Sequence, residues 1–272
     1  MEYEFRFAPV GKLQLRYVEV GEGAPVILIH GLAGDCQGWF ALIEALRHRF
    51  RVIAFDNRGA GKSTQFDEPV TTADLAADTF GLMDYLGVER AHVVGRSMGG
   101  AIAQIMALQQ PDRIRSLVLC ASFAKLDPLG RRVLTVMREV LEWRKSWADH
   151  ARHAVHYFVS ARFFNEHPDI VAGIERLIGG ESRLQAAYWR QNHACLAHDT
   201  ADDLARILQP TLVLGGAVDP VASLTATAQL SDGLPNSHTV IFEDASHFFL
   251  MEQPERFSRL VEDWLDRHGE GS

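Results

Sequence analysis

The most informative stretch of the sequence is Ala91-His92-Val93-Val94-Gly95-Arg96-Ser97-Met98-Gly99-Gly100. It predicts a short buried strand, a serine framed by two glycines, and a helix that continues to about residue 109. A serine in so tight a strand-to-helix turn has a strained backbone, and its hydroxyl stands clear of the sheet. The framing glycines, Gly95 and Gly99, avoid collisions with the neighbouring strand and helix. Taken alone, residues 95–99 fit a glycine-rich turn with an incidental serine equally well, so the rest of the chain must decide.

The composition is that of a globular protein with enough residues for a full core. The chain has 272 residues, of which 47% are hydrophobic and 23% are charged, as in ordinary soluble proteins. A formal net charge of −8 argues against binding to nucleic acids and to anionic membranes. The sequence has neither a signal-peptide pattern nor an apolar run near the ~20 residues of a membrane span. We therefore expect a cytoplasmic protein, a monomer or a homodimer, whose partner is a small molecule.

Strand-like and helical patterns alternate along most of the chain. Polar and apolar residues alternate over 2–8 and 12–20, which predicts an antiparallel hairpin. Further strands are predicted at 25–30, 51–56, 91–94, 114–120, 211–215 and 238–242, and helices at about 38–48, 71–86, 98–109 and 254–267. This alternation is typical of an α/β fold, in which a mostly parallel sheet, here of eight strands, has helices on both faces.

Residues 125–200 interrupt this rhythm. They contain helical patterns rich in Trp, His and Arg but no strand-like run. We therefore predict a core made of residues 1–124 and 201–272, and a helical cap made of residues 125–200. In such folds the ligand binds at the carboxyl edge of the strands, which is where this insertion is expected to lie.

A serine nucleophile requires a base, and the base requires an orienting carboxylate. Asp219 follows the predicted strand 211–215, and His247 follows the predicted strand 238–242. Both therefore fall on loops at the same edge of the sheet as Ser97, in the chain order serine, acid, histidine. Asp127 is an alternative acid, and Asp219 is also suited to cap a helix before Pro220.

Two backbone N–H groups are expected to stabilise the oxyanion that forms during acyl transfer. One is that of Met98, at the start of the helix after the serine. The other comes from the loop after the strand 25–30, where we assign it to Leu32. We expect His30, at the end of that strand, to hold this loop in place.

Three other patterns are weaker. Gly59-Ala60-Gly61-Lys62-Ser63 resembles the end of a phosphate-binding loop, but the glycine required at position 56 is Asp56. His150, His153 and His156 are spaced as on one helix face, but no acidic residue or cysteine keeps their period, so no metal site is expected. Cys36, Cys120 and Cys195 have no CxxC spacing and are interpreted as reduced thiols. No cofactor is required by any of these patterns.

Jointly, these motifs resemble the α/β-hydrolase superfamily over essentially the full chain. The matching residues are His30-Gly31, Asp56-Asn57-Arg58-Gly59-Ala60-Gly61-Lys62-Ser63, the Ser97 turn, Asp219 and Ala245-Ser246-His247. Residues 97–120 and the helical cap look most like 3-oxoadipate enol-lactonases and small bacterial carboxylesterases. The resemblance implies hydrolysis of a carboxylic ester or lactone through an acyl-serine intermediate.

Some residues depart from the usual pattern of the superfamily. Arg96 stands where His, Leu, Phe or Asn is usual, and Ala60 stands where His is frequent. Carbon–carbon bond hydrolases of aromatic degradation usually have Asn before the serine and Trp after the histidine. Here these positions hold Arg96 and Phe248, which makes such a hydrolase the second interpretation. A ligand-sensing member of the superfamily with little turnover is a further alternative, because such proteins keep the triad.

Substrate choice is expected to depend on the cap and on aromatic residues near the triad. Candidates for the pocket wall are Trp39, Phe123, Phe158, Trp189 and Phe248. Two interpretations of Arg96 remain open at this point: attraction of a substrate carboxylate, and a salt bridge to a neighbouring residue.

Overall fold

The computed structural model describes residues 3–180 and 185–269. Its single sheet has eight strands in the order β1-β2-β4-β3-β5-β6-β7-β8. Their bounds are β1 (Arg6–Val10), β2 (Leu13–Val20), β3 (Ala24–Ile29), β4 (Phe50–Phe55), β5 (Ala91–Arg96), β6 (Ile114–Cys120), β7 (Thr211–Gly216) and β8 (Ser237–Phe242). β2 pairs antiparallel with β1 and β4, and all other pairings are parallel. The predicted α/β fold with a mostly parallel eight-stranded sheet is confirmed.

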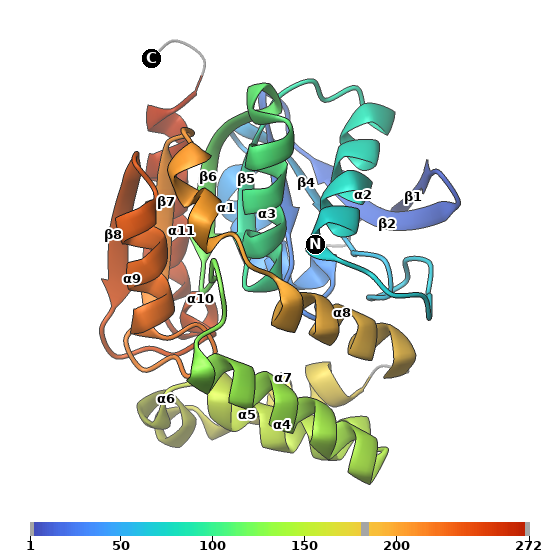
Figure 1. The fold of residues 1–272 in the computed structure, drawn as a ribbon, viewed down its shortest axis with the longest axis vertical. Helices are drawn as coiled ribbons and strands as arrows, with labels where there is room; N and C mark the ends of the chain where they lie inside the picture. The colour runs from blue at the N-terminus through green and yellow to red at the C-terminus, as the bar shows by residue number, and fades with distance from the viewer. Residues whose placement is uncertain (1–2, 181–184, 270–272) are drawn as a thin grey trace.

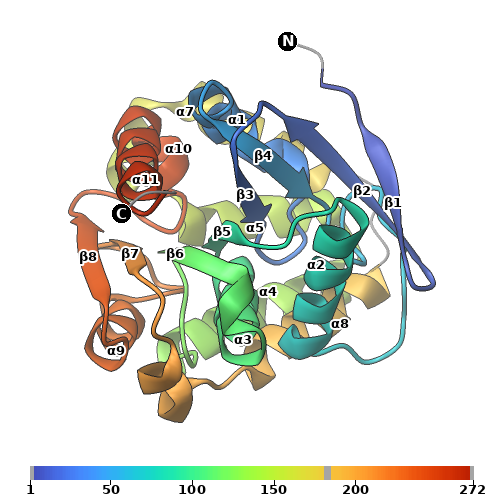
Figure 2. The same cartoon turned by 90° about the horizontal axis from the view of Figure 1, so that it is seen from above.

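Helices cover both faces of the sheet (Figure 2). On one face lie α2 (Thr72–Tyr85), α3 (Met98–Gln109) and α9 (Leu224–Gly233), and on the other lie α1 (Phe40–Leu46) and α11 (Pro254–Arg267). The predicted helix 38–48 is in fact a 3₁₀ turn, η1 (Cys36–Trp39), followed by α1. Two further 3₁₀ turns, η2 (Pro111–Arg113) and η3 (Ala201–Arg206), precede β6 and β7, and the short α10 (Phe249–Glu252) precedes α11.

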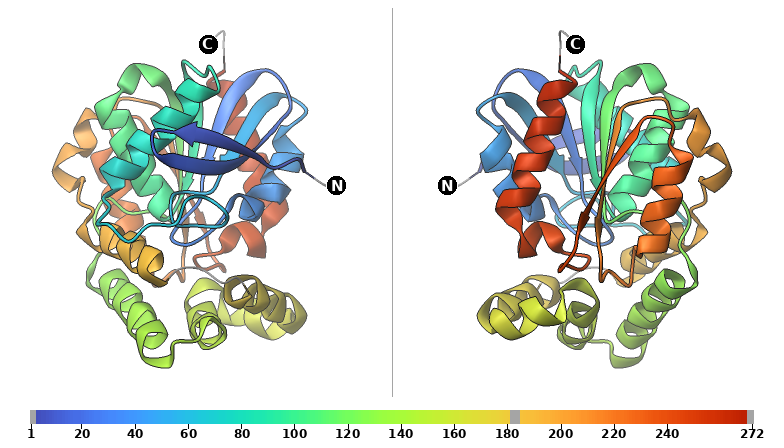
Figure 3. Two further views of the ribbon diagram at one scale, coloured as in Figure 1. Left: turned by 90° about the vertical axis from the view of Figure 1, so that its right-hand side faces the viewer. Right: turned by 90° about the vertical axis from the view of Figure 1, so that its left-hand side faces the viewer.

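Five helices form a separate layer beyond one end of the sheet (Figures 1 and 3). They are α4 (Pro128–Arg144), α5 (Trp147–Phe158), α6 (Ala161–Glu166), α7 (Pro168–Gly179) and α8 (Gln185–Ala197). All five lie in the chain between β6 and β7, so this layer covers the edge at which the parallel strands β3 to β8 end. No helix within the described ranges is long and apolar enough to cross a membrane.

The central strands are buried on both faces because helices cover both. β5 is buried at every position, and in β3 the last four residues, Val26–Ile29, are buried. Even the polar side chain of His92, the second residue of β5, is fully buried, and its Nδ1 bonds to the Ser116 hydroxyl at 2.8 Å. Burial disfavours the charged imidazolium and lowers the pKa of His92 to about 4. His198, also buried, has its pKa lowered to about 4 for the same reason.

These two histidines predict a loss of stability in mild acid. In the unfolded chain both imidazoles have a pKa near 6.5, whereas in the folded chain it is about 4. Between these two values the unfolded chain therefore binds more protons than the folded chain. The free energy of unfolding should therefore fall as the pH drops through this window. His92→Asn keeps a polar partner for Ser116 and should make the fall shallower, although it lowers stability at pH 7. Urea unfolding at several pH values checks this, and an unchanged slope in the variant would contradict it.

Candidate active site

Ser97 occupies the single-residue turn between β5, which ends at Arg96, and α3, which begins at Met98. Its backbone angles are φ 52° and ψ −118°, a region that costs a non-glycine residue about 1–3 kcal/mol. Two hydrogen bonds hold it there. The Ser97 N–H donates to the Cys120 carbonyl at 2.8 Å, and the Ser122 hydroxyl donates to the Ser97 carbonyl at 2.9 Å. The serine is therefore strained and fixed from the β6 side.

The framing glycines are required by close packing. A Cβ on Gly95 would lie 2.3 Å from the Gly99 carbonyl oxygen, and a Cβ on Gly99 would lie 2.0 Å from the Ile29 carbonyl oxygen. Both distances are far below contact distance. Helix α3 thus approaches β3 and β5 as closely as backbones can, which leaves the turn only one residue long.

Asp219 and His247 form the hydrogen-bonded pair that the sequence suggests. Asp219 Oδ2 lies 2.8 Å from His247 Nδ1, and its Oδ1 accepts from the N–H groups of Val221 and Ala222 at 2.7 and 3.0 Å. An ionised carboxylate has no proton to donate, so His247 carries its hydrogen on Nδ1 and leaves Nε2 as the basic atom. These two N–H bonds fix the turn that follows Asp219, but the next helix, α9, is capped by Ser223, so the helix-capping interpretation of Asp219 is wrong.

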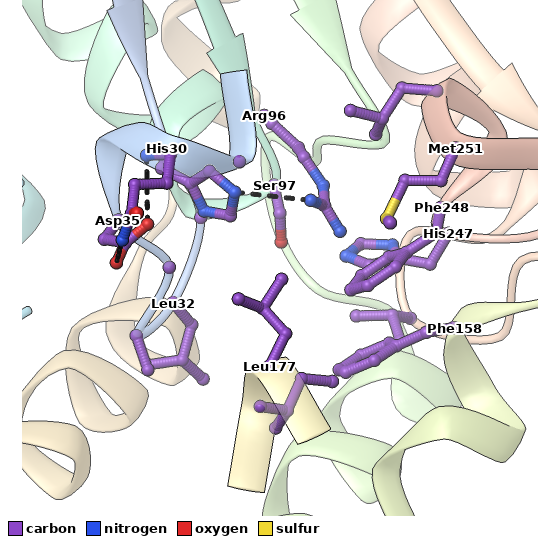
Figure 4. A pocket seen from close by; sticks show the side chains of 18 of the residues that line it. His30, Leu32, Asp35, Arg96, Ser97, Phe158, Leu177, His247, Phe248 and Met251 are labelled. Carbon is purple, nitrogen blue, oxygen red and sulfur yellow. Dashed lines mark hydrogen bonds between the residues drawn. The ribbon is translucent and has the colours of Figure 1, made fainter. Parts of the chain in front are cut away.

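Ser97 and His247 lie on the wall of the same cavity (Figure 4). Both residues are buried, with 8% and 3% of their surface exposed. The hydrogen bonds of the described residues do not include one between Ser97 Oγ and His247. Catalytic contacts of this kind often tighten only when substrate binds. A serine and a histidine thus meet at one cavity, and the histidine is hydrogen-bonded to the Asp219 carboxylate, as acyl transfer by a serine requires.

The loop after β3 lies directly against the serine. A Cβ on Gly31 would be 3.0 Å from Ser97 Cβ and 3.6 Å from its Oγ, and Leu32 lines the cavity. Met98 is the first residue of α3, so its N–H has no partner within the helix. The hydrogen bonds of the described residues give neither N–H an acceptor. Both groups are thus next to Ser97 and available, and their role at the oxyanion stays a prediction.

The alternative residues have other partners. Asp127 caps α4 by accepting from the Gly130 N–H, and its other oxygen accepts from the Ser223 hydroxyl. The ring of His30 fills the space beside Gly34 and Gly38, where an added Cβ would overlap it. It therefore supports the loop 31–38, as expected, and also lines the cavity.

The cavity has a volume of about 380 Å³. Of the five aromatic residues predicted for its wall, Phe158 and Phe248 line it, and their rings stack with centroids 4.5 Å apart. Trp39, Phe123 and Trp189 are not among the described lining residues, so that part of the prediction is wrong. Trp39 and Phe123 are fully buried in the core, and Trp189 packs against the cluster of Ala33, Leu141 and Tyr188. Sequence alone does not distinguish a core aromatic from one in a pocket wall.

A contact that the sequence did not indicate joins the cap to the histidine loop. The Phe248 N–H donates to the Phe158 carbonyl at 2.7 Å, at the end of α5. Glu252 accepts from the N–H groups of Ser246 and Ser160 at 2.8 and 3.1 Å. Phe158 also stacks on the His247 ring, with centroids 5.6 Å apart. The end of α5 is therefore fastened to the loop that carries His247.

The weaker patterns have structural explanations. In the loop 59–63, the Lys62 N–H bonds to the Asp56 carboxylate at 2.9 Å, and the same carboxylate pairs with Arg16. The three histidines of α5 have separate neighbours. His150 Nδ1 bonds to the Met137 carbonyl, His153 contacts Tyr157, and His156 stacks on Phe164. All three cysteines are free and buried, and burial raises the pKa of the Cys195 thiol to about 12.

Comparison with known proteins agrees with this geometry. The family model described as alpha/beta hydrolase fold matches residues 24–254. The chain belongs to the α/β-hydrolase family. It is accordingly a hydrolase, and the strained serine, acid and histidine occupy the positions on the sheet that this fold uses.

Among curated relatives of this α/β hydrolase, the "Putative carbamate hydrolase RutD" of Caulobacter sp. (strain K31) is 33% identical over 88% of this chain and 90% of its own. A Pseudomonas putida protein named 2-hydroxy-6-oxononadienedioate/2-hydroxy-6-oxononatrienedioate hydrolase 2 is 30% identical, covering 93% and 92%. These names differ in the bond that is cleaved, so the relatives establish hydrolysis but no single substrate class.

Two solved structures are also similar. A thermophilic esterase from Thermogutta terrifontis, with malate bound, is 29% identical with a TM-score of 0.86, covering 97% of this chain and 99% of its own. The enol-lactonase from Burkholderia xenovorans LB400 is 27% identical with a TM-score of 0.87, covering 96% and 100%. The expected resemblance to lactonases and esterases is confirmed at this level.

The close packing at Gly99 predicts the effect of one methyl group. Gly99→Ala should prevent the α3–β3 approach, displace Ser97 and reduce hydrolysis at least about 100-fold, as small misplacements of catalytic groups do. Gly173→Ala is the matched control, because its Cβ would meet only the end of Arg176 at 3.9 Å. That control should be as active as wild type and slightly more stable. Thermal melting and ester hydrolysis check both variants, and wild-type activity in Gly99→Ala would contradict the account.

Proposed function

We propose that this hydrolase cleaves a carboxylic ester or lactone through an acyl-serine intermediate. The observation that carries the proposal is the 2.8 Å hydrogen bond between Asp219 and His247, since His247 lines the cavity together with strained Ser97. A neutral serine hydroxyl is a poor nucleophile, and such a pair is what activates it.

In the first step, Ser97 Oγ attacks the carbonyl carbon while His247 Nε2 takes the hydroxyl proton. Asp219 holds the imidazole in the required tautomer and stabilises the imidazolium. The tetrahedral intermediate then collapses, and the alcohol oxygen leaves with the proton from His247. For a lactone, the alcohol remains attached to the acyl group.

In the second step, His247 accepts a proton from water, which attacks the acyl-serine carbonyl. Collapse of the second intermediate releases the acid and returns the proton to Ser97. The N–H groups of Leu32 and Met98 are proposed to bind the oxyanion in both steps, and losing one such donor typically costs about 3 kcal/mol. The reaction needs no metal and no cofactor.

The cavity supports substrates of small or medium size. Its volume of about 380 Å³ falls near the lower end of common ligand sites. Leu32, Met137, Leu177 and Met251 contribute apolar surface, together with the stacked rings of Phe158 and Phe248. The names of the Thermogutta and Burkholderia structures, an esterase and an enol-lactonase, support the same substrate class.

A carbon–carbon bond hydrolase is the second candidate, and the name of the Pseudomonas putida relative favours it. Arg96 and Phe248 stand against it, because they depart from the residues expected of such enzymes at these two positions. The name of the RutD relative adds carbamates to the substrates to be compared, since a carbamate has the same attackable carbonyl carbon.

Hydrolysis of p-nitrophenyl esters from acetate to octanoate tests the proposal. We expect steady turnover that is fastest for short or medium chains. Ser97→Ala should reduce kcat about 10⁴-fold or more, and Asp219→Asn about 10⁴-fold. Ser237→Ala is the matched control. Ser237 begins the edge strand β8, at the opposite end from the loop of His247, and its hydroxyl bonds to the Ser231 carbonyl.

Two results would contradict the proposal. A single stoichiometric burst without further turnover would favour a ligand sensor. Cleavage of a vinylogous 1,5-diketone acid, with esters, lactones and carbamates untouched, would favour the carbon–carbon hydrolase.

A further inference from the structure

The proposed acyl transfer gives no role to Arg96, a buried and charged side chain at the site. Arg96 is the last residue of β5 and directly precedes Ser97. Only 4% of its surface is exposed, yet it lines the cavity with Ser97 and His247. Figure 4 shows its side chain extending into the cavity, with its end between the rings of His30 and His247.

The guanidinium contacts a histidine and an aromatic ring. Nη1 lies 3.4 Å from His30 Nε2, a long hydrogen bond, and Cζ lies 3.8 Å from the centre of the Phe248 ring. Nε is buried without a hydrogen-bond partner. Within the described part of the chain, no carboxylate forms a salt bridge with Arg96, so the salt-bridge interpretation of this residue is wrong.

The nearby carboxylates are already engaged. Asp35 lines the cavity, but it caps η1 and pairs with Arg16 at 3.4 Å. Asp219 accepts three hydrogen bonds, from His247, Val221 and Ala222. Neither is free to neutralise Arg96 without giving up these contacts.

A buried charge without a counter-charge is unfavourable, because it loses its hydration and gains no ion pair. The group does not avoid this by losing its proton, since burial lowers the pKa of Arg96 only to about 10, and the negative charge of Asp219, which forms no ion pair with it, opposes that fall. The Phe248 ring compensates in part through its negative face. The end of the side chain reaches into the cavity, from which a ligand can supply a further negative charge.

We propose that Arg96 determines specificity by binding a carboxylate of the substrate, which is therefore an ester or lactone that carries a free acid group. This inference rests on the proposed function. Arg96 and Ser97 line the same cavity of about 380 Å³, so one small ligand can reach both the guanidinium and the Ser97 hydroxyl. The carboxylate accordingly lies within a few bonds of the scissile carbonyl, as in the monoester of a short dicarboxylic acid.

The test compares monomethyl glutarate, which is an anion, with dimethyl glutarate, which is neutral and otherwise alike. For wild type we expect kcat/KM to favour the anion about 10- to 100-fold, the range of a charge-assisted hydrogen bond. Arg96→Gln should abolish this preference, and Arg96→Lys should keep part of it, because lysine retains the charge but not the planar fork. The matched control is Arg206→Gln, which makes the same change in net charge at an exposed ion pair in η3.

A binding measurement keeps the inference testable without turnover. Calorimetric titration with glutarate should give weaker binding to Arg96→Gln than to wild type, by a similar factor, with Arg206→Gln unchanged. If Arg96→Gln does not fold, glutarate and glutaramide can be compared as inhibitors of wild type, and only glutarate should compete.

The same measurements separate a failure of the Arg96 role from a failure of the proposed ester hydrolysis. Hydrolysis of dimethyl glutarate by Ser97, without preference for the monoester, would overturn the role of Arg96 and leave the ester hydrolase intact. Absence of turnover of both esters would count against the ester hydrolase. In that case equal glutarate binding by wild type and Arg96→Gln would overturn the anion site as well.

Discussion

The close approach of helix α3 to strand β3 is the constraint on which the site depends. Gly99 lies so near the Ile29 carbonyl that no side chain fits between them. The turn from β5 into α3 is therefore a single residue, and that residue must adopt a left-handed backbone conformation. Ser97 holds this position because the buried strands on either side of β5 fix the turn. The energy that stabilises the sheet thus maintains the strain at the nucleophile.

The remaining groups reach Ser97 because parallel strands end at one edge of the sheet. Asp219 and His247 lie on the loops that follow β7 and β8, and Leu32 lies on the loop that follows β3. The cap closes this edge and is fastened to the histidine loop through Phe158 and Glu252. The position of the His247 ring is therefore coupled to the end of α5, on which its neighbour Phe158 lies.

Local patterns in the sequence predicted the eight strands, because apolar runs and alternation report burial in a sheet. They also singled out Ser97, Asp219 and His247, because the chemistry of a serine nucleophile fixes residue types and their order. Contacts between segments that are distant in the sequence could not be predicted from local patterns. Trp39 and Phe123 are aromatic, as residues of a pocket wall often are, but their side chains are buried in the core. Glu252 carries no motif, and its role depends on two segments that lie 92 residues apart. The two interpretations of Arg96 could be separated only once its surroundings were known.

The central claim is that backbone strain and the Asp219–His247 pair make Ser97 a nucleophile. Labelling with a fluorophosphonate, followed by peptide mapping, tests it most directly, because the reagent reports nucleophilicity without a choice of substrate. We expect one adduct per chain, on Ser97, and much slower labelling in His247→Gln. Labelling of another serine, or none at Ser97 in the folded protein, would contradict it.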